Sequence, residues 1–227
     1  MYIYTITYQP LAVTMETCVS LSPTHPIQQT PIPNDYPQTV EITPYDIDKY
    51  FDHIEQRIYQ ILSRPAKETL TYDILDTDKT IQYKRIVLKE KQRQMKIGEI
   101  WQEVIGDYDG YINLRVGDKS GLDIVSHKYK IAIELKNRTN TDNASSRKAN
   151  LDKLAKFKKE HPDYTCMYAN INEDTEEKTM SGTMKEIIHD DTVVVYATGY
   201  AFLRHIFKEE TDRIIYFVKK TIEKYIL

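Results

Sequence analysis

The chain has 227 residues, of which 41% are hydrophobic and 29% are charged, and its formal net charge at pH 7 is −3. This composition is that of a protein with a substantial core, and no stretch approaches the roughly 18–20 consecutive apolar residues of a membrane-spanning helix. The N-terminus lacks the basic region and apolar run of a signal peptide. With only two cysteines, far apart in the sequence, we expect a reduced, cytoplasmic protein that does not bind membranes.

The first 44 residues are rich in threonine and proline, and eight of the nine prolines fall between positions 10 and 65. Because proline lacks a backbone donor, this composition favours an extended arm or leader over a helix or a central strand. Thr43 and Pro44 are typical of the first residues of a helix. Apolar residues at helical spacing then predict an amphipathic helix over 45–63. We expect residues 45–227 to form one domain.

In the later segments, apolar residues at helical spacing alternate with apolar residues at strand spacing. Residues 70–88 are compatible with one or two strands around a turn at 76–79, and 172–190 is a polar stretch in which we predict no element. Apolar spacing predicts helices over 90–105, 147–160, 199–207 and 210–225, and strands over 111–116, 122–126, 129–136, 164–171 and 192–197. This order predicts an α/β fold with a central mixed β-sheet flanked by helices, whose core spans about 90–172.

The strand predicted over 129–136 carries charged groups on one of its faces. Side chains alternate along a strand, so Glu134 and Lys136 point away from the face that holds its large apolar side chains. Asp123, eleven positions before Glu134, should lie on the neighbouring strand and face the same way. Half-buried charges cost desolvation free energy unless they are paired or bind a ligand. Two carboxylates beside a lysine can hold a divalent metal and activate water at a phosphodiester.

The middle of the chain is basic although the chain as a whole is acidic. Residues 128–159 carry ten basic and three acidic side chains, a net charge of +7, which leaves −10 for the rest. This asymmetry indicates a localised surface for a polyanion.

The order of the elements, with Asp123 before one strand and Glu134-Leu135-Lys136 on the next, resembles that of the PD-(D/E)xK nucleases. The sequence Glu-Leu-Lys-Asn, followed by Asn-Thr-x-Asn-x-Ser-Ser over 140–146, is similar to a subset of type II restriction endonucleases. One departure is Leu122, where the family places a proline.

The resemblance implies a restriction-endonuclease-like core and a metal-dependent reaction. Asp123, Glu134 and the main-chain carbonyl of Leu135 would bind Mg²⁺, for which Mn²⁺ could substitute. Lys136 would orient or deprotonate the attacking water, and hydrolysis would leave 5′-phosphate and 3′-hydroxyl ends. Many relatives add an acid from the preceding helix, and both Glu99 and Glu103 are candidates for that catalytic role.

The resemblance also implies double-stranded DNA as the partner, read by a homodimer, with a cognate DNA methyltransferase that would protect the host. The segment after the catalytic strand would face the duplex, because asparagine and arginine can read bases and hydroxyls can hold phosphates. The candidate DNA-binding residues are Asn137, Arg138, Asn140, Thr141, Asn143, Ser145, Ser146, Arg147, Lys148, Asn150 and Lys153. The helices at 45–63 and 199–225 would be dimer or scaffold elements.

Two alternatives stay open at this point. One is a structure-specific DNA repair or recombination nuclease of the same fold, and the other is a non-catalytic DNA-binding relative. The sequence does not decide whether a bacterium or a large DNA virus is the source.

Overall fold

Helix α1 (Ile47–Leu62) begins the part of the chain that the computed structural model describes, which comprises residues 45–65, 69–138 and 143–226. The predicted arm over 1–44 and the predicted helix start at Thr43 lie outside these residues. The cap of α1 is Asp46, whose side chain accepts a hydrogen bond from the backbone N–H of Lys49 (3.1 Å). An aspartate satisfies a free N–H of the first turn, which is why the helix begins after Asp46.

Helix α2 (Asp78–Gly106) is 29 residues long, so the strands predicted over 70–88 are wrong from residue 78 onwards. The segment at 76–79 is a helix start and not a hairpin turn. Thr77 and Thr80 exchange side-chain and backbone hydrogen bonds in a capping box. Lysine, arginine, glutamine and glutamate dominate the turns that follow, and these residues lose little side-chain freedom in a helix. Their preference outweighs that of the few β-branched residues among them.

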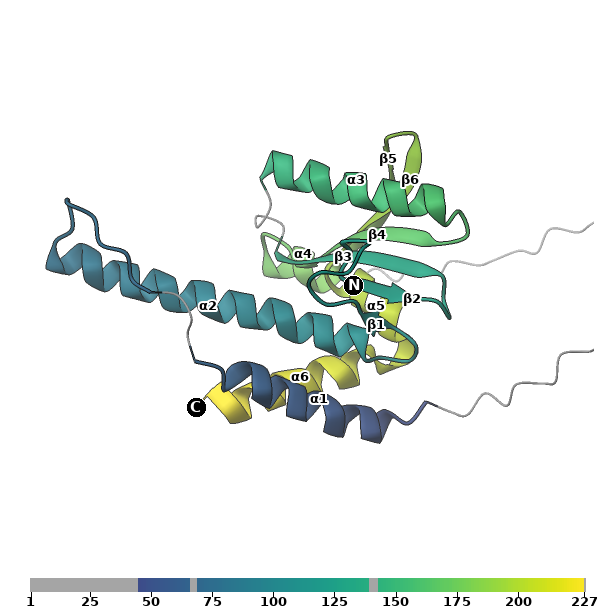
Figure 1. The fold of residues 1–227 in the computed structure, drawn as a ribbon. Helices are drawn as coiled ribbons and strands as arrows, with labels where there is room; N and C mark the ends of the chain where they lie inside the picture. Colours follow the sequence, from purple (N-terminus) through teal and green to yellow (C-terminus); the bar gives the residue numbers. More distant parts are fainter. Residues whose placement is uncertain (1–44, 66–68, 139–142, 227) are drawn as a thin grey trace, which may run out of the picture. The chain divides into compact units, whose positions relative to one another are not determined.

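A six-stranded mixed sheet forms the centre of the domain and confirms the predicted fold class (Figure 1). Its order is β1-β2-β3-β4-β6-β5. The meander β1 to β3 is antiparallel, β3, β4 and β6 are parallel, and β5 returns antiparallel at the edge. The strands are β1 (Ile112–Asn113), β2 (Ile124–Ser126), β3 (Ile131–Arg138), β4 (Thr165–Asn172), β5 (Thr183–His189) and β6 (Thr192–Thr198).

The polar stretch at 172–190 contains helix α4 (Glu176–Ser181) and strand β5, neither of which we predicted. Strand β5 is largely exposed, so its sequence shows no apolar face. The turn that joins it to β6 is Asp190-Asp191, with φ of 49° and 56°. Two successive residues of positive φ form the tight turn that suits the twist of a hairpin, but glycine is the residue that normally signals it.

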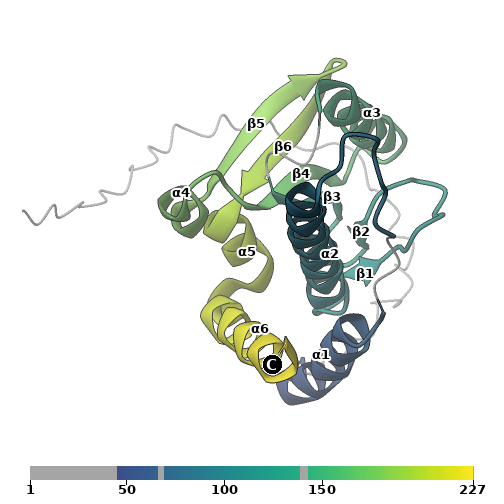
Figure 2. The same cartoon turned by 90° about the vertical axis from the view of Figure 1, so that its left-hand side faces the viewer.

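Helices cover both faces of the sheet (Figures 1 and 2). Helix α3 (Ala144–Glu160) lies on one face, and the C-terminal half of α2 with α5 (Gly199–Phe207) lies on the other. A 3₁₀ turn (Lys208–Glu210) leads into α6 (Thr211–Ile226), which packs beside α1. Each face has its own hydrophobic cluster, and side chains of β3 alternate between the two clusters, as predicted.

The pairing of α1 with α6 places the predicted dimer or scaffold elements against each other within one chain. The rings of Phe51 and Phe217 stack with centroids 4.3 Å apart, and Lys224 donates to Glu55 at 2.6 Å. Ile54 and Ile58 are fully buried in the same cluster. These helices therefore act as a scaffold of the domain. Across the described ranges, every helix falls short of the length or the apolar character that crossing a bilayer requires.

Candidate active site

Asp123 sits at the entrance to β2, where the chain emerges from a tight turn. Gly121 closes that turn with φ of 67°, a conformation that glycine adopts without strain. The backbone N–H of Asp123 donates to the carbonyl of Ile133 (3.1 Å). Since Ile124 is paired with Ile133, Asp123 lies opposite Glu134 across the antiparallel pair. The predicted placement of these two acids on neighbouring strands is therefore observed.

The side chain of Asp123 is held on both of its oxygens. Oδ2 accepts a hydrogen bond from the backbone N–H of Leu135 (2.7 Å), and Oδ1 accepts one from Nε2 of Gln102 (3.0 Å). The same acid, with Gln102 and Asn113, lines a cavity of about 230 Å³. A carboxylate that is fixed by donors and faces a cavity is pre-organised for a ligand.

Glu134 is buried on β3, with only 3% of its side chain exposed, and Lys136 is next to it on the same face. The Nζ of Lys136 donates to Oε1 of Glu134 at 2.7 Å. The other oxygen, Oε2, is buried without a hydrogen-bond partner among the described residues. Burial raises the pKa of Glu134, the negative charge of Asp123 raises it further, and the hydrogen bond from Lys136 opposes both effects. The geometry thus concentrates negative charge where water is scarce.

Oε2 of Glu134, which accepts no hydrogen bond among the described residues, is the atom that fits a hard cation. A buried carboxylate oxygen without a donor costs free energy, which a bound metal ion would offset. Asp123 supplies a second carboxylate on the neighbouring strand. Within residues 45–65, 69–138 and 143–226 there is no cluster of three or more histidine, cysteine or acidic side chains at metal-binding distance. The protein set here is therefore two carboxylates, to which main-chain carbonyls and water could add oxygen ligands.

Glu103 and Glu99, the two helix acids named from the sequence, have different surroundings. Glu103 is buried on α2 and forms a short ion pair with Arg115, with a second arginine, Arg57, 3.9 Å from its Oε2. Glu99 is more exposed and pairs with Arg64 at 2.6 Å. The α2 side chain that bonds Asp123 is Gln102, between them in sequence. A glutamine carries no charge pattern, so sequence reasoning had no signal for it.

Helix α3 brings a second ammonium group to the acids. The Nζ of Lys153 lies 3.8 Å from Oε2 of Glu134 and donates to the carbonyl of Gly121 (3.2 Å) and to Oδ1 of Asn150 (3.1 Å). Lys153 and Asn150 were predicted to follow the DNA backbone. The structure places Lys153 beside the carboxylates and buries Asn150.

Four of the predicted DNA-contact residues, Ser145, Ser146, Arg147 and Lys148, lie in the first turns of α3, and Asn143 immediately precedes it. Asn137 and Arg138 end β3, while Asn140 and Thr141 lie outside the described ranges. Asn143 caps the helix by accepting from the N–H of Ser146 (2.8 Å) and from Oγ of Ser145 (2.7 Å). This cap starts the helix at Ala144, three residues before the predicted start. Lys148 pairs with an acid of the next turn. The side chains over 143–148 are all exposed.

Arg147 ends above two stacked tyrosines on the sheet. Its guanidinium lies 5.7 Å from the ring centroid of Tyr168 and 5.3 Å from that of Tyr196. These two rings are nearly parallel, with centroids 6.1 Å apart. A guanidinium over an aromatic face is attracted by the ring quadrupole, so the tyrosines fix this end of α3 over β4 and β6.

Asn170 is a buried residue of this face that sequence reasoning missed. It is the partner of Lys136 in the parallel β3–β4 register, and it is 2% exposed. Its Nδ2 donates to the hydroxyl of Tyr196 at 3.2 Å, while its Oδ1 has no partner among the described residues. Two buried oxygens without a hydrogen-bond donor among the described residues therefore belong to the neighbours of Lys136. They are Oδ1 of Asn170 and Oε2 of Glu134.

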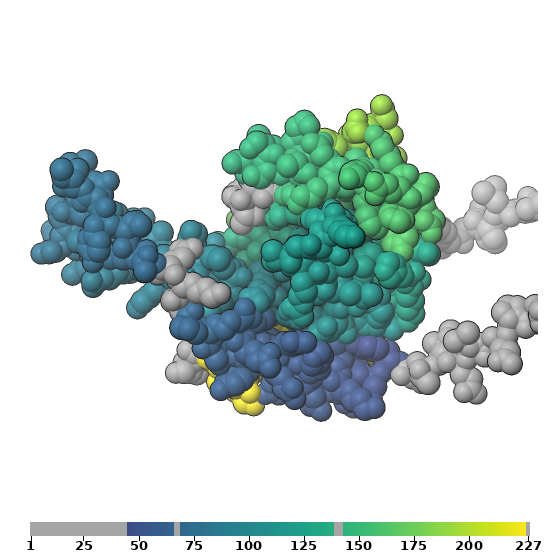
Figure 3. Space-filling model, viewed as in Figure 1, coloured from purple at the N-terminus to yellow at the C-terminus, as the bar shows by residue number. Residues whose placement is uncertain are grey.

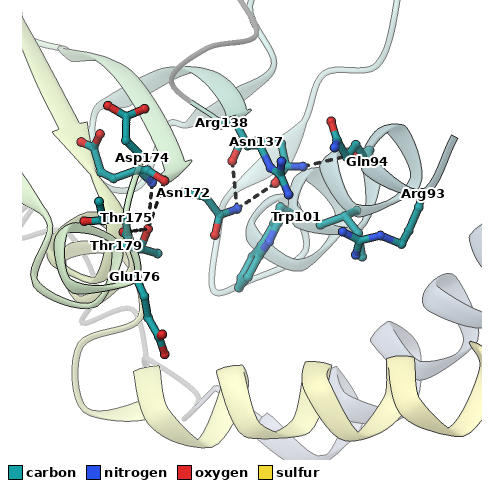
Figure 4. A pocket seen from close by; sticks show the side chains of 12 residues that line it. Arg93, Gln94, Trp101, Asn137, Arg138, Asn172, Asp174, Thr175, Glu176 and Thr179 are labelled. Atoms are coloured by element: carbon teal, nitrogen blue, oxygen red, sulfur yellow. Dashed lines mark hydrogen bonds between the residues drawn. The ribbon is translucent and has the colours of Figure 1, made fainter. Parts of the chain in front are cut away.

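The ends of β3 and β4 border a larger cavity of about 770 Å³, between α2 and α4 (Figure 4). Asn137 and Arg138 line it from β3, Asn172 from β4, and Trp101 from α2. Nδ2 of Asn172 donates to both the backbone carbonyl (2.9 Å) and Oδ1 (3.0 Å) of Asn137, and Nδ2 of Asn137 donates to the carbonyl of Gln94 (3.3 Å). Amides and a guanidinium thus converge where β3 ends.

The comparisons with known proteins agree with this geometry. A model of the Eco47II restriction endonuclease family matches residues 52–213, a range that includes the whole meander, α3 and Asn170. A comparison with curated proteins finds no match to the chain. The family match confirms the predicted resemblance to type II restriction endonucleases and is consistent with a core of the PD-(D/E)xK type. The chain belongs to the Eco47II restriction endonuclease family.

Proposed function

We propose that this restriction endonuclease is a type II enzyme that hydrolyses double-stranded DNA at a specific sequence with Mg²⁺ as cofactor, for which Mn²⁺ can substitute. The products carry 5′-phosphate and 3′-hydroxyl ends. The observation that carries the proposal is the buried Oε2 of Glu134, without a hydrogen-bond partner, beside Asp123 and Lys136. A buried carboxylate oxygen without a hydrogen bond costs stability, which a cation bound by these two acids would offset.

Asp123 and Glu134 would hold the cation, together with the carbonyl of Leu135. When bound, the cation supplies Lewis-acid polarisation of the phosphate and lowers the pKa of a bound water. Gln102 and the N–H of Leu135 keep the carboxylate of Asp123 oriented by donating to it. Glu99 and Glu103 stay candidates for a further acid, and their ion pairs with arginines favour a scaffold role for both.

Lys136 places its ammonium group where charge develops on the phosphate, and it orients the attacking water. A cation held by Glu134 would weaken the attraction between that carboxylate and Lys136, whose Nζ now contacts Oε1. Asn170 Oδ1, adjacent in register and without a donor, would then accept from Nζ. We therefore assign Asn170 as a positioning residue that acts through Lys136.

The DNA would run across the end of β3 and the start of α3. Asn137 and Arg138 have the amide and guanidinium groups that read adenine and guanine edges, and Arg147 and Lys148 would contact phosphates. A homodimer would place two such sites on one palindromic duplex. A DNA methyltransferase of the same specificity would protect the host genome.

The test of the active site uses isosteric substitutions. Asp123→Asn, Glu134→Gln and Lys136→Met should each lower the cleavage rate of a long duplex by at least about 10³-fold, the scale of losing one catalytic group. A Glu186→Gln variant, which changes an exposed acid of β5, is the matched control and should cleave as wild type does. Discrete fragments from mixed-sequence DNA support site specificity. Ladders or junction-only cleavage would contradict it, and full activity of Asp123→Asn would refute the assignment.

The role of Asn170 is tested by a double-mutant cycle with Lys136. If Asn170 acts through the lysine, Asn170→Ala slows cleavage in wild type but adds nothing to Lys136→Met. Affinity for DNA in Ca²⁺ should stay unchanged in both single variants. Additive losses would show that Asn170 acts elsewhere, and Asn170→Asp should restore part of the rate because it keeps an acceptor.

A further inference from the structure

The N-terminal half of α2 leaves the body of the domain and carries the preceding segment with it (Figures 1 and 3). Gln94 and Lys96 tie α2 to the rest of the domain, through the side chain of Asn137 and the backbone carbonyls of Leu62 and Arg64. Before this point the helix runs outward, and Lys84 links it to Asp76 at 2.7 Å. We call residues 69–93 the arm.

The arm exposes large apolar side chains although it carries many charges. On α2 they follow helical spacing at i, i+3 and i+4, and on the preceding segment they lie close together. These side chains are 47–100% exposed, and they are Tyr72, Ile74, Leu75, Tyr83, Ile86 and Val87. A groove of about 580 Å³ joins the two segments, lined by the apolar side chains of Leu70, Tyr83, Val87 and Leu88. Large exposed apolar side chains gathered on one segment, with an apolar groove between its two parts, mark an interaction surface.

The exposed apolar area is a large part of what each partner of a stable protein pair buries. A tyrosine removes roughly 150–250 Å² from water when it is buried completely. For valine, leucine or isoleucine, the area that follows from the free energy of burying the side chain is roughly 60–120 Å². At the observed exposed fractions, the six side chains together offer roughly 400–700 Å². A standard interface buries about 800 Å² on each partner. The apolar side chains of the arm could therefore supply about half or more of one side of a dimer interface.

We propose that the arm is the surface through which two copies of this chain associate. An apolar stripe is complementary to itself, so a two-fold axis can pair it with its own copy in an isologous contact. These apolar side chains would form no favourable contact with the phosphate groups of DNA. The arm also mixes six basic residues with four acidic ones, and it pairs some of them internally, such as Arg93 with Glu90 at 2.8 Å. This charge pattern suits a protein partner better than a polyanion.

The proposed function requires two active sites on one duplex, and the two-fold symmetry of the arm contact rests on that function. Helix α2 begins in the arm and ends at the active site, where Gln102 bonds Asp123. Pairing of two arms would therefore connect the active sites of two chains through two rigid helices.

The oligomeric state can be measured without DNA or metal. Light scattering of the full chain at tens of micromolar should give twice the 26.7 kDa mass of one chain. The double substitution Tyr83→Glu with Ile86→Glu should halve the mass while circular dichroism and the melting temperature show a folded domain. Leu75→Glu, which lies outside the helix, is the second variant and should weaken the dimer as well. Tyr216→Glu, on the exposed face of α6, is the matched control and should stay dimeric.

Three results would overturn the proposal. A wild-type protein that is monomeric under these conditions would show that the chain does not form a dimer. Arm variants that stay dimeric, including variants that lose only DNA affinity, would show that the arm is not the interface. Monomers formed by Tyr216→Glu alone would move the interface to α6. Because mass is measured without substrate, a failure of the nuclease proposal would leave these results unchanged.

Discussion

Replacing Glu134 with glutamine should abolish cleavage and yet stabilise the metal-free protein. The glutamine keeps the shape of the side chain and an oxygen for Lys136, but it removes a buried charge that faces Asp123. An unsatisfied buried polar atom costs about 1–3 kcal/mol, and part of this is regained when the charge is removed. We expect the free energy of unfolding to rise by about 1 kcal/mol at pH 8, a shift of about 2–4 °C in a domain of this size.

The gain depends on pH in a direction that the structure fixes. The pKa of Glu134 is raised in the folded protein, so the ionised form weakens the fold. The advantage of Glu134→Gln should therefore be small at a pH below the ordinary glutamate value. It should grow as the pH rises through the raised pKa and then stay constant.

Thermal unfolding in EDTA measures this difference, with Glu186→Gln as the control that should leave the melting temperature unchanged. Addition of Mg²⁺ should raise the melting temperature of the wild type, because a ligand that binds only the folded state stabilises it, and should leave that of Glu134→Gln unchanged. A metal-free Glu134→Gln protein that melts below the wild type would refute this reasoning.

Three further predictions concern the scaffold around the site. Ile58→Ala should lower the free energy of unfolding by about 2–5 kcal/mol in a denaturant titration, because Ile58 is fully buried; a loss below 0.5 kcal/mol would contradict its place in the core. Arg115→Ala should cost about 1–3 kcal/mol by leaving the buried Glu103 short of a partner, and Glu103→Gln should reverse most of that loss in the double variant. In a Cys18→Ser background, Cys166 should resist iodoacetamide at pH 8 until the protein unfolds, because burial raises the pKa of its thiol to about 11; rapid labelling of the native protein would show that it is exposed.

Strand β3 was predictable because its sequence alternates. The segment 129–136 places its large apolar side chains on one face, and the antiparallel pairing with β2 brings Asp123 opposite Glu134. Helix α2 was mispredicted over 78–88 because its β-branched and aromatic residues there favour a strand, and the structure leaves its apolar side chains exposed. Strand β5 was missed because it is an exposed edge whose sequence shows no apolar face.

Other parts of the site arise from pairings that no local pattern encodes. Asn170 stands beside Lys136 only because β3 and β4 are parallel in one particular register. Lys153 reaches Glu134 because α3 crosses back over the sheet, and Gln102 reaches Asp123 because α2 packs against β2. A sequence can indicate which side chains bear charge, but the neighbours of each charge depend on how distant elements are packed.

Cleavage of a fully sequenced genomic DNA, with mapping of every fragment end, tests the central claim most directly. In Mg²⁺ the wild type should produce fragments whose ends share one short sequence and carry 5′-phosphates. Asp123→Asn and Glu134→Gln should bind the same DNA in Ca²⁺ and cut it in neither metal. Ends without a common sequence, or cleavage by either variant at the wild-type rate, would contradict an active site built on Asp123, Glu134 and Lys136.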